Sequence, residues 1–165
     1  GFICGNPNQS VSAKRLDGYR SALAEMGMSE DAALIAPGLF SYRSGLDAAE
    51  RLLALDDRPT AIFASNDDMA AAAVAVAHRH ALDVPGDVTV CGFDDTPLAT
   101  TIWPELTTIR QPIREMSRTA IDMLLTEIRA RRGPLSSVPR QLLLDYELVR
   151  RQSDAAPASP SLARA

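Results

Sequence analysis

The adjacent carboxylates Asp94 and Asp95 are the residues whose types and position most directly suggest chemistry. They follow residues 88–93 (VTVCGF), an apolar and β-branched run between turn-forming residues, which predicts a short buried strand. Both carboxylates would then stand just beyond the carboxyl end of that strand. Such a pair could act as a general acid and base, or it could hold a magnesium ion.

Catalysis by this pair is nevertheless not the preferred interpretation. Neighbouring residues of an extended chain point to opposite faces, so both carboxylates would not meet one reacting atom, and one would hold the next turn. The two histidines, His78 and His80, would diverge on a helix instead of sharing a ligand. Sequence motifs of serine hydrolases, zinc proteases and nucleotide-binding loops do not occur. We therefore expect no enzyme, no metal site and no cofactor.

The elements that must position these groups alternate along the chain. Strands are predicted at residues 2–5, 33–36, 60–64, 88–93, 106–109, 142–144 and 146–149. Helices are predicted at residues 10–27, 44–55, 68–80 and 113–131. This alternation predicts an α/β fold with a mostly parallel, doubly wound sheet and right-handed crossovers.

Ligands of such sheets bind beyond the carboxyl ends of the strands. The sequence places Phe40, Asn66 and Asp94 there, with Arg15 nearby. A carboxylate that accepts hydrogen bonds from hydroxyls, a guanidinium and an amide that donate them, and an aromatic face together suit a sugar or another polar ring. Each residue also has a structural interpretation: Asn66 as a helix cap, Arg15 as a surface residue and Phe40 as part of the core.

Length and composition are those of one soluble globular domain. The 165 residues are enough to bury one core, and 46% hydrophobic with 23% charged residues are ordinary proportions. Basic residues are interleaved with acidic ones, which excludes a nucleic-acid-binding run. Cys4 and Cys91 lie in apolar runs, so we expect buried, reduced thiols, which suit the cytoplasm. Neither a signal peptide nor a membrane span is recognised.

Three motifs occur in a particular order: residues 65–70 (SNDDMA), 83–97 (DVPGDVTVCGFDDTP) and 104–112 (PELTTIRQP). Together they resemble the effector-binding domain of the lactose and galactose repressor (LacI/GalR) family of bacterial transcription regulators. Residues 15–20 (RLDGYR) resemble a helix of the same family, so the likeness covers nearly all of residues 1–151. The resemblance implies a type I periplasmic-binding-protein-like fold of two lobes, with effector in the cleft and a helix-turn-helix headpiece at the amino terminus.

The resemblance also implies a division of the chain. Residues 1–109 would be most of the carboxyl-terminal lobe, and residues 110–151 a crossover helix with closing strands. Residues 152–165, rich in Ala, Ser and Pro, are expected to be a disordered tail. The effector-contacting positions of the family match Arg15, Phe40, Asn66 and Asp94, with Gln111 near the crossover as a secondary candidate. Asp95 is expected to hold the turn.

The implied function is the effector-binding part of a LacI-type DNA-binding regulator, with a sugar or a nucleoside-like effector. Operator DNA would be bound only through the headpiece, which is missing from these residues. The apolar face of the helix at residues 113–131 lacks its cover from the first lobe, so we expect a homodimer. The alternative is a sugar-binding receptor of a transport system, which shares the fold; an upstream headpiece or signal peptide distinguishes the two. We expect a cytoplasmic protein without membrane association.

Overall fold

The computed structural model describes residues 1–131 and 141–155. The chain divides into two compact units. The first contains residues 1–109 together with residues 148–155, and the second contains the described residues between 110 and 147. The first unit holds the carboxylate pair and the three predicted helices that precede it, whereas the predicted helix at residues 113–131 belongs to the second unit.

A sheet of six strands runs through the described chain in the order β2-β1-β3-β4-β5-β6. The strands are β1 (Phe2–Ile3), β2 (Ile35–Ala36), β3 (Ala61–Ala64), β4 (Thr89–Asp94), β5 (Thr107–Arg110) and β6 (Glu147–Val149). The pairs β1–β2, β1–β3 and β3–β4 are parallel, and Phe2 lies opposite both Ile35 and Phe63. Strand β1 therefore lies between β2 and β3, so the strand order reverses at β1. The parallel pairing with intervening helices confirms the predicted α/β class.

The helices are α1 (Ser10–Glu25), α2 (Tyr42–Leu53), α3 (Asp67–Arg79) and α4 (Ile113–Arg131), with short 3-10 turns η1 (Ala32–Leu34) and η2 (Pro97–Thr100). Helix α2 begins two residues earlier than predicted because Ser41 caps it. The Ser41 hydroxyl accepts a hydrogen bond from the Ser44 amide, and the Ser44 hydroxyl accepts one from the Ser41 amide. This capping box satisfies backbone donors that the first turn would otherwise leave unpaired.

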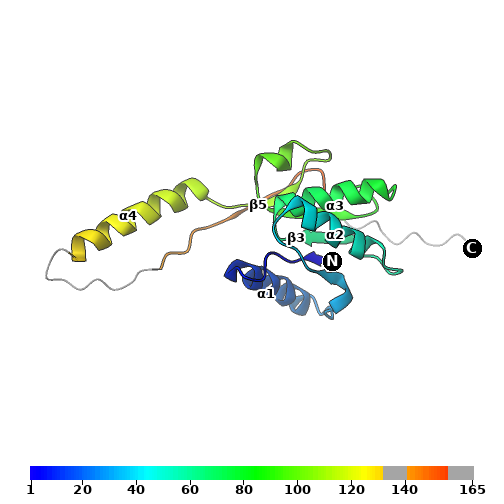
Figure 1. Cartoon of the computed structure of the whole chain (residues 1–165), viewed down its shortest axis with the longest axis horizontal. Coiled ribbons are helices and arrows are strands. Elements are labelled where there is room, and N and C mark those ends of the chain that lie inside the picture. The colour runs from blue at the N-terminus through cyan, green and yellow to red at the C-terminus, as the bar shows by residue number, and fades with distance from the viewer. Residues whose placement is uncertain (132–140, 156–165) are drawn as a thin grey trace, which may run out of the picture. The chain divides into compact units, whose positions relative to one another are not determined.

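Helices cover both faces of the sheet (Figure 1). On β1, the Phe2 ring stacks on Tyr19 of α1 with a centroid distance of 4.9 Å, whereas Ile3 belongs to the core formed with α2 and α3. The same alternation occurs on β3. The ring centre of Phe63 lies 5.7 Å from that of Phe2, whereas the Ile62 side chain belongs to the core with Ile3 on the opposite face. Since successive strand residues point to opposite faces, α1 covers one face, and α2 with α3 covers the other.

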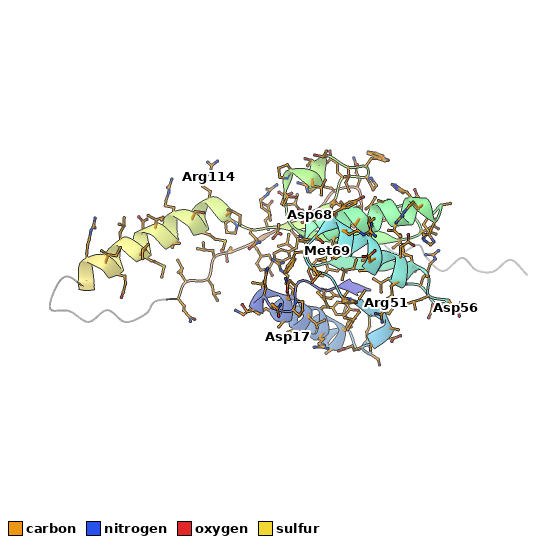
Figure 2. All side chains as sticks on the ribbon, viewed as in Figure 1. Asp17, Arg51, Asp56, Asp68, Met69 and Arg114 are labelled. Carbon is orange, nitrogen blue, oxygen red and sulfur yellow. The ribbon has the colours of Figure 1, made fainter. Side chains whose placement is uncertain are left out.

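The alanine-rich helix α3 packs tightly against both the sheet and α2. Its Met69 is fully buried and lies toward the middle of the first unit, whereas the exposed Asp17 and Asp56 lie at its outside (Figure 2). A Cβ on Gly45 of α2 would stand 2.6 Å from the Met69 Cα, so glycine is required for this approach. The small alanine side chains of α3 thus allow close packing, with the sheet and α2 as the partners.

The predicted strand at residues 142–144 is wrong. This segment is irregular, and Leu142 and Leu143 are 60% and 96% exposed. An apolar run becomes a strand only where another strand pairs with it.

The ordered chain also continues beyond residue 152, where the tail was expected to begin. Ser153 is fully buried: its carbonyl oxygen accepts a hydrogen bond from the Val90 amide at 2.8 Å, and its amide donates to the Glu105 carbonyl at 3.0 Å. Residues 152–155 thus belong to the first unit because they bridge β4 and the segment before β5. The rest of the expected tail, residues 156–165, lies outside the described residues.

Cys4 and Cys91 are free thiols, as expected, but each is half-buried instead of fully buried. Desolvation raises the pKa of both thiols, that of Cys91 to about 11. Both sulfurs are therefore protonated at neutral pH, a state of low nucleophilicity.

Helix α4, in the second unit, carries a row of exposed apolar side chains. These residues, between 41% and 56% exposed, are Ile113, Met116, Ile121, Leu124, Leu125 and Ile128. None of the described helices is both long and apolar enough to cross a membrane.

Candidate ligand-binding site

Four residues predicted from the sequence meet at the carboxyl edge of the first unit's sheet. Arg15 comes from the second turn of α1, and Phe40 from the loop after β2. Asn66 is the N-cap of α3, in the turn after β3, and Asp94 is the last residue of β4. Contacts described below join these four positions. The structure thus brings together groups that are up to 79 residues apart in sequence.

Arg15 is the central side chain of this cluster. Its Nη1 donates a hydrogen bond to the Ser65 carbonyl at 2.7 Å, and its Nη2 lies 3.5 Å from Asp94 Oδ1. The side chains of Arg15 and Asp94 are 15% and 30% exposed. Burial lowers the pKa of Arg15, although the nearby Asp94 charge opposes this shift. The guanidinium still stays charged, because its ordinary pKa lies far above neutrality.

Phe93 is a member of the cluster that the sequence did not identify. The Arg15 guanidinium carbon lies 3.9 Å from the centre of the Phe93 ring and 5.4 Å from the centre of the Phe40 ring. Arginine over an aromatic face is attracted by the negative potential of the ring. The only sequence signal for Phe93 is that it directly precedes Asp94. Within the apolar run of residues 88–93, however, a phenylalanine is interpreted as a core residue.

Asn66 joins two loops of the site. Its Oδ1 accepts a hydrogen bond from the Met69 amide at 3.0 Å, which caps α3, and its Nδ2 donates to the Phe40 carbonyl at 3.0 Å. The residue is 7% exposed. The structural interpretation of Asn66 as a cap is therefore confirmed, and the same amide also holds the backbone of Phe40 in place.

Three residues of the site have the positive φ angles that side chains rarely adopt. The angles are 60° at Phe40, 109° at Asp94 and 53° at Asp95, and only Ala81 shares this feature among the other described non-glycine residues. Such conformations cost on the order of 1–3 kcal/mol each and persist only where surrounding contacts enforce them. The chain is therefore strained at the edge where the candidate site lies.

Asp94 and Asp95 have different partners, as the sequence predicted. Asp95 Oδ1 accepts a hydrogen bond of 2.6 Å from Arg151 Nη2, and both side chains are nearly buried. The Asp95 amide also lies 3.4 Å from the Thr108 hydroxyl oxygen. Asp95 holds the turn, and Asp94 faces Arg15.

Asp67 is a second supporting carboxylate, fully buried beneath the turn. It accepts hydrogen bonds of 2.6 Å from the Thr96 amide and from the Thr108 hydroxyl. Burial raises the pKa of Asp67, and these hydrogen bonds act in the opposite direction. Gly92 leaves the necessary room, because a Cβ there would lie 2.4 Å from Asp67 Oδ1.

Gln111 belongs to the second unit, so its assignment to the site stays a prediction. Within residues 1–131 and 141–155, no three His, Cys, Asp or Glu side chains are grouped so that they could hold a metal ion. What the described cluster offers is hydrogen-bond acceptors, a guanidinium and two aromatic rings.

Comparison with known proteins agrees with this architecture. Residues 1–153 match the model of the periplasmic binding protein-like domain. The chain belongs to this family. A relative, the HTH-type transcriptional repressor PurR of Photobacterium profundum, is 38% identical over 129 residues, which are 78% of this chain and 39% of the repressor.

Two solved structures resemble the domain closely. The transcriptional regulator CelR in complex with cellobiose has a TM-score of 0.87 and 34% identity, over 93% of this chain and 46% of that one. A dimeric Lac repressor with an 11-residue C-terminal deletion has a TM-score of 0.85 and 29% identity, over 95% and 55%. The relatives are LacI-family regulators, which confirms the resemblance. The domain spans less than half of the length of PurR and CelR.

Proposed function

We propose that this domain is the effector-binding part of a LacI-type transcription regulator, and that it binds a sugar or another hydroxyl-bearing ring next to Arg15 and Asp94. The observation that carries the proposal is the long contact of 3.5 Å between Arg15 and Asp94, at the edge of a parallel sheet where ligands bind. A contact of this length is weak, so a ligand hydroxyl can insert between the two charges and bond to both.

The surrounding side chains suit a polar ring. Asp94 accepts hydrogen bonds from neighbouring hydroxyls, and Arg15 donates to ring or hydroxyl oxygens. Phe40 and Phe93, both half-buried, supply apolar surface for the carbon face of the ring. The cellobiose bound to CelR supports a sugar as the first class to test, with nucleosides as the second.

The regulatory role follows from the relatives named as repressors. An effector that prefers one arrangement of the protein shifts the population toward it, which changes operator affinity elsewhere in the molecule. We infer that the protein acts in the cytoplasm as a homodimer, contacts operator DNA through a headpiece and catalyses no reaction. A transport receptor would share the fold, and an upstream signal peptide in place of a headpiece would favour it.

A thermal-shift measurement on the full-length protein tests the binding role. The panel is cellobiose, D-glucose, D-galactose, D-ribose, adenosine and cytidine, and a compound that binds the folded state raises the midpoint of unfolding. Asp94→Ala should abolish the shift and leave the midpoint without ligand nearly unchanged. The matched control Asp56→Ala, at an exposed position on the outside of the first unit (Figure 2), should keep the shift. An undiminished shift in Asp94→Ala would overturn the site.

A further inference from the structure

The segment after β6 reaches the turn that carries Asp94. Arg151, in this segment, contacts Asp95 across 56 residues of sequence. Its Nη1 also donates a hydrogen bond to the Leu106 carbonyl at 2.8 Å, and its Nε lies 3.9 Å from a Glu105 carboxylate oxygen. One guanidinium therefore ties the turn after β4 to the segment that leads into β5.

The backbone of this segment is itself anchored, so Arg151 projects from a fixed base. The Arg151 amide donates a hydrogen bond to the Thr107 hydroxyl at 2.8 Å. Two residues later, the Ser153 hydroxyl donates to the Val90 carbonyl at 2.6 Å and accepts a bond from the Thr107 amide at 2.8 Å. These bonds attach the segment to both β4 and β5.

The Arg151–Asp95 ion pair is nearly buried and lies beside the turn that carries Asp94, so its loss should affect that turn. The side chains are 12% and 9% exposed, so water replaces either partner poorly. Removing Arg151 takes the guanidinium away from the nearly buried carboxylate of Asp95, which is unfavourable. Asp94 and Asp95 both have positive φ, so the turn needs such external contacts to keep its conformation.

We propose that Arg151 is a positioning residue of the effector site: through Asp95 it holds the strained turn in the conformation that points Asp94 toward Arg15. Arg151 acts through Asp95, and the contacts described for it do not include Arg15 or Asp94. This inference rests on the proposed function of Asp94 as an effector contact. It adds a residue from the segment that follows β6, remote in sequence from every predicted contact.

Hydrogen–deuterium exchange on the full-length protein tests the positioning without any ligand. Arg151→Gln should speed exchange in peptides that contain residues 94–96, while peptides from α2 and α3 stay protected. Arg150→Gln is the matched control. The Arg150 side chain neighbours Arg151 in sequence, but it is 66% exposed and pairs with Asp154 instead of Asp95. Arg151→Lys should give an intermediate result, since an ammonium cannot reproduce the guanidinium fork between Asp95 and Leu106. Exchange at residues 94–96 equal to the control overturns the proposal.

Affinity supplies the second arm of the test. For whichever of the six panel compounds binds the wild-type protein, Arg151→Gln should weaken binding by about tenfold, the effect of losing a hydrogen bond between charged groups. Unchanged affinity despite faster exchange would overturn the role of Arg151 in binding. If no panel compound binds the wild-type protein, the proposed function fails, and the exchange result alone decides the positioning. Should Arg151→Gln not fold, Asp95→Asn provides the same two measurements.

Discussion

The fully buried carboxylate of Asp67 on α3 accepts a hydrogen bond of 2.6 Å from the hydroxyl of Thr108 on β5. The bond spans 41 residues and connects the helix behind Asn66 to the strand that follows the carboxylate pair. Asp67 also holds the Thr96 amide just after Asp95. The turn is therefore supported from two sides, by Asp67 beneath it and by Arg151 beside it.

Thr108→Val should destabilise the fold by about 1–3 kcal/mol, because a buried carboxylate loses one hydrogen bond that no water replaces. Chemical denaturation measures this loss. The control Thr100→Val removes an exposed hydroxyl that bonds only within its own turn, and its effect should stay within about 0.5 kcal/mol. Equal effects of the two substitutions would contradict a special role for the Asp67–Thr108 bond.

The cost of Thr108→Val should depend on pH. Burial holds the pKa of Asp67 in the folded protein above its value in the unfolded chain. The free energy of unfolding therefore falls as pH rises from the unfolded pKa of Asp67 through its folded pKa. The Thr108 bond favours the ionised form, and its loss raises the folded pKa further. Denaturation across this window should show a larger destabilisation at neutral pH than at acidic pH. A constant difference would mean that Asp67 does not ionise in the folded protein.

Arg15→Lys should weaken effector binding by about tenfold or more, because an ammonium replaces neither the guanidinium fork nor its stacking on Phe93. Titration calorimetry with a compound that binds the wild-type protein measures the change. Arg43→Lys, on an 83% exposed side chain of α2, is the control and should bind like wild type. Full affinity of Arg15→Lys would show that charge alone, without the fork, suffices.

Gly5→Ala should destabilise the protein by about 1–3 kcal/mol, because the added methyl would lie 2.0 Å from Phe40 Cζ and must displace that ring. Gly18→Ala is a paired experiment with the opposite sign. It lies inside α1 with nothing within 4 Å of the added methyl, so it should stabilise by about 0.5–1 kcal/mol. Thermal unfolding measures both, and a neutral Gly5→Ala would mean that Phe40 is not held against the Gly5 backbone.

The exposed apolar side chains of α4 should support self-association of the full-length protein. Sedimentation of the wild-type protein should give a dimer. Leu124→Glu should weaken the dimer, because the substitution places a charge among Ile121, Leu125 and Ile128. Thr126→Glu adds the same charge on the opposite side of the helix and should leave the dimer intact. A wild-type protein that stays monomeric at high concentration would contradict the homodimer.

Much of the first unit follows from local sequence signals. Short apolar runs ending in turn residues located β1, β3 and β4, and helical periodicity located α1, α2 and α3 to within about two residues in most cases. The rule that ligands bind beyond the carboxyl ends of parallel strands selected Phe40, Asn66 and Asp94. Local pattern gave the wrong strand at residues 142–144, because apolar character does not provide a neighbouring strand. It also assigned Ser153 to a disordered tail, because a small polar residue among Ala and Pro gives no local sign of burial.

Sequence alone thus determined the α/β class and the order of most elements, since periodicity and turn chemistry are local properties, and the family resemblance selected Asp94 over Asp95. Tertiary structure alone decided which groups support that carboxylate. Phe93 lies over the Arg15 guanidinium, Asp67 binds Thr108, and Arg151 binds Asp95. These contacts join residues between 41 and 78 positions apart, and a pairing over such distances arises only when folding brings strand ends together.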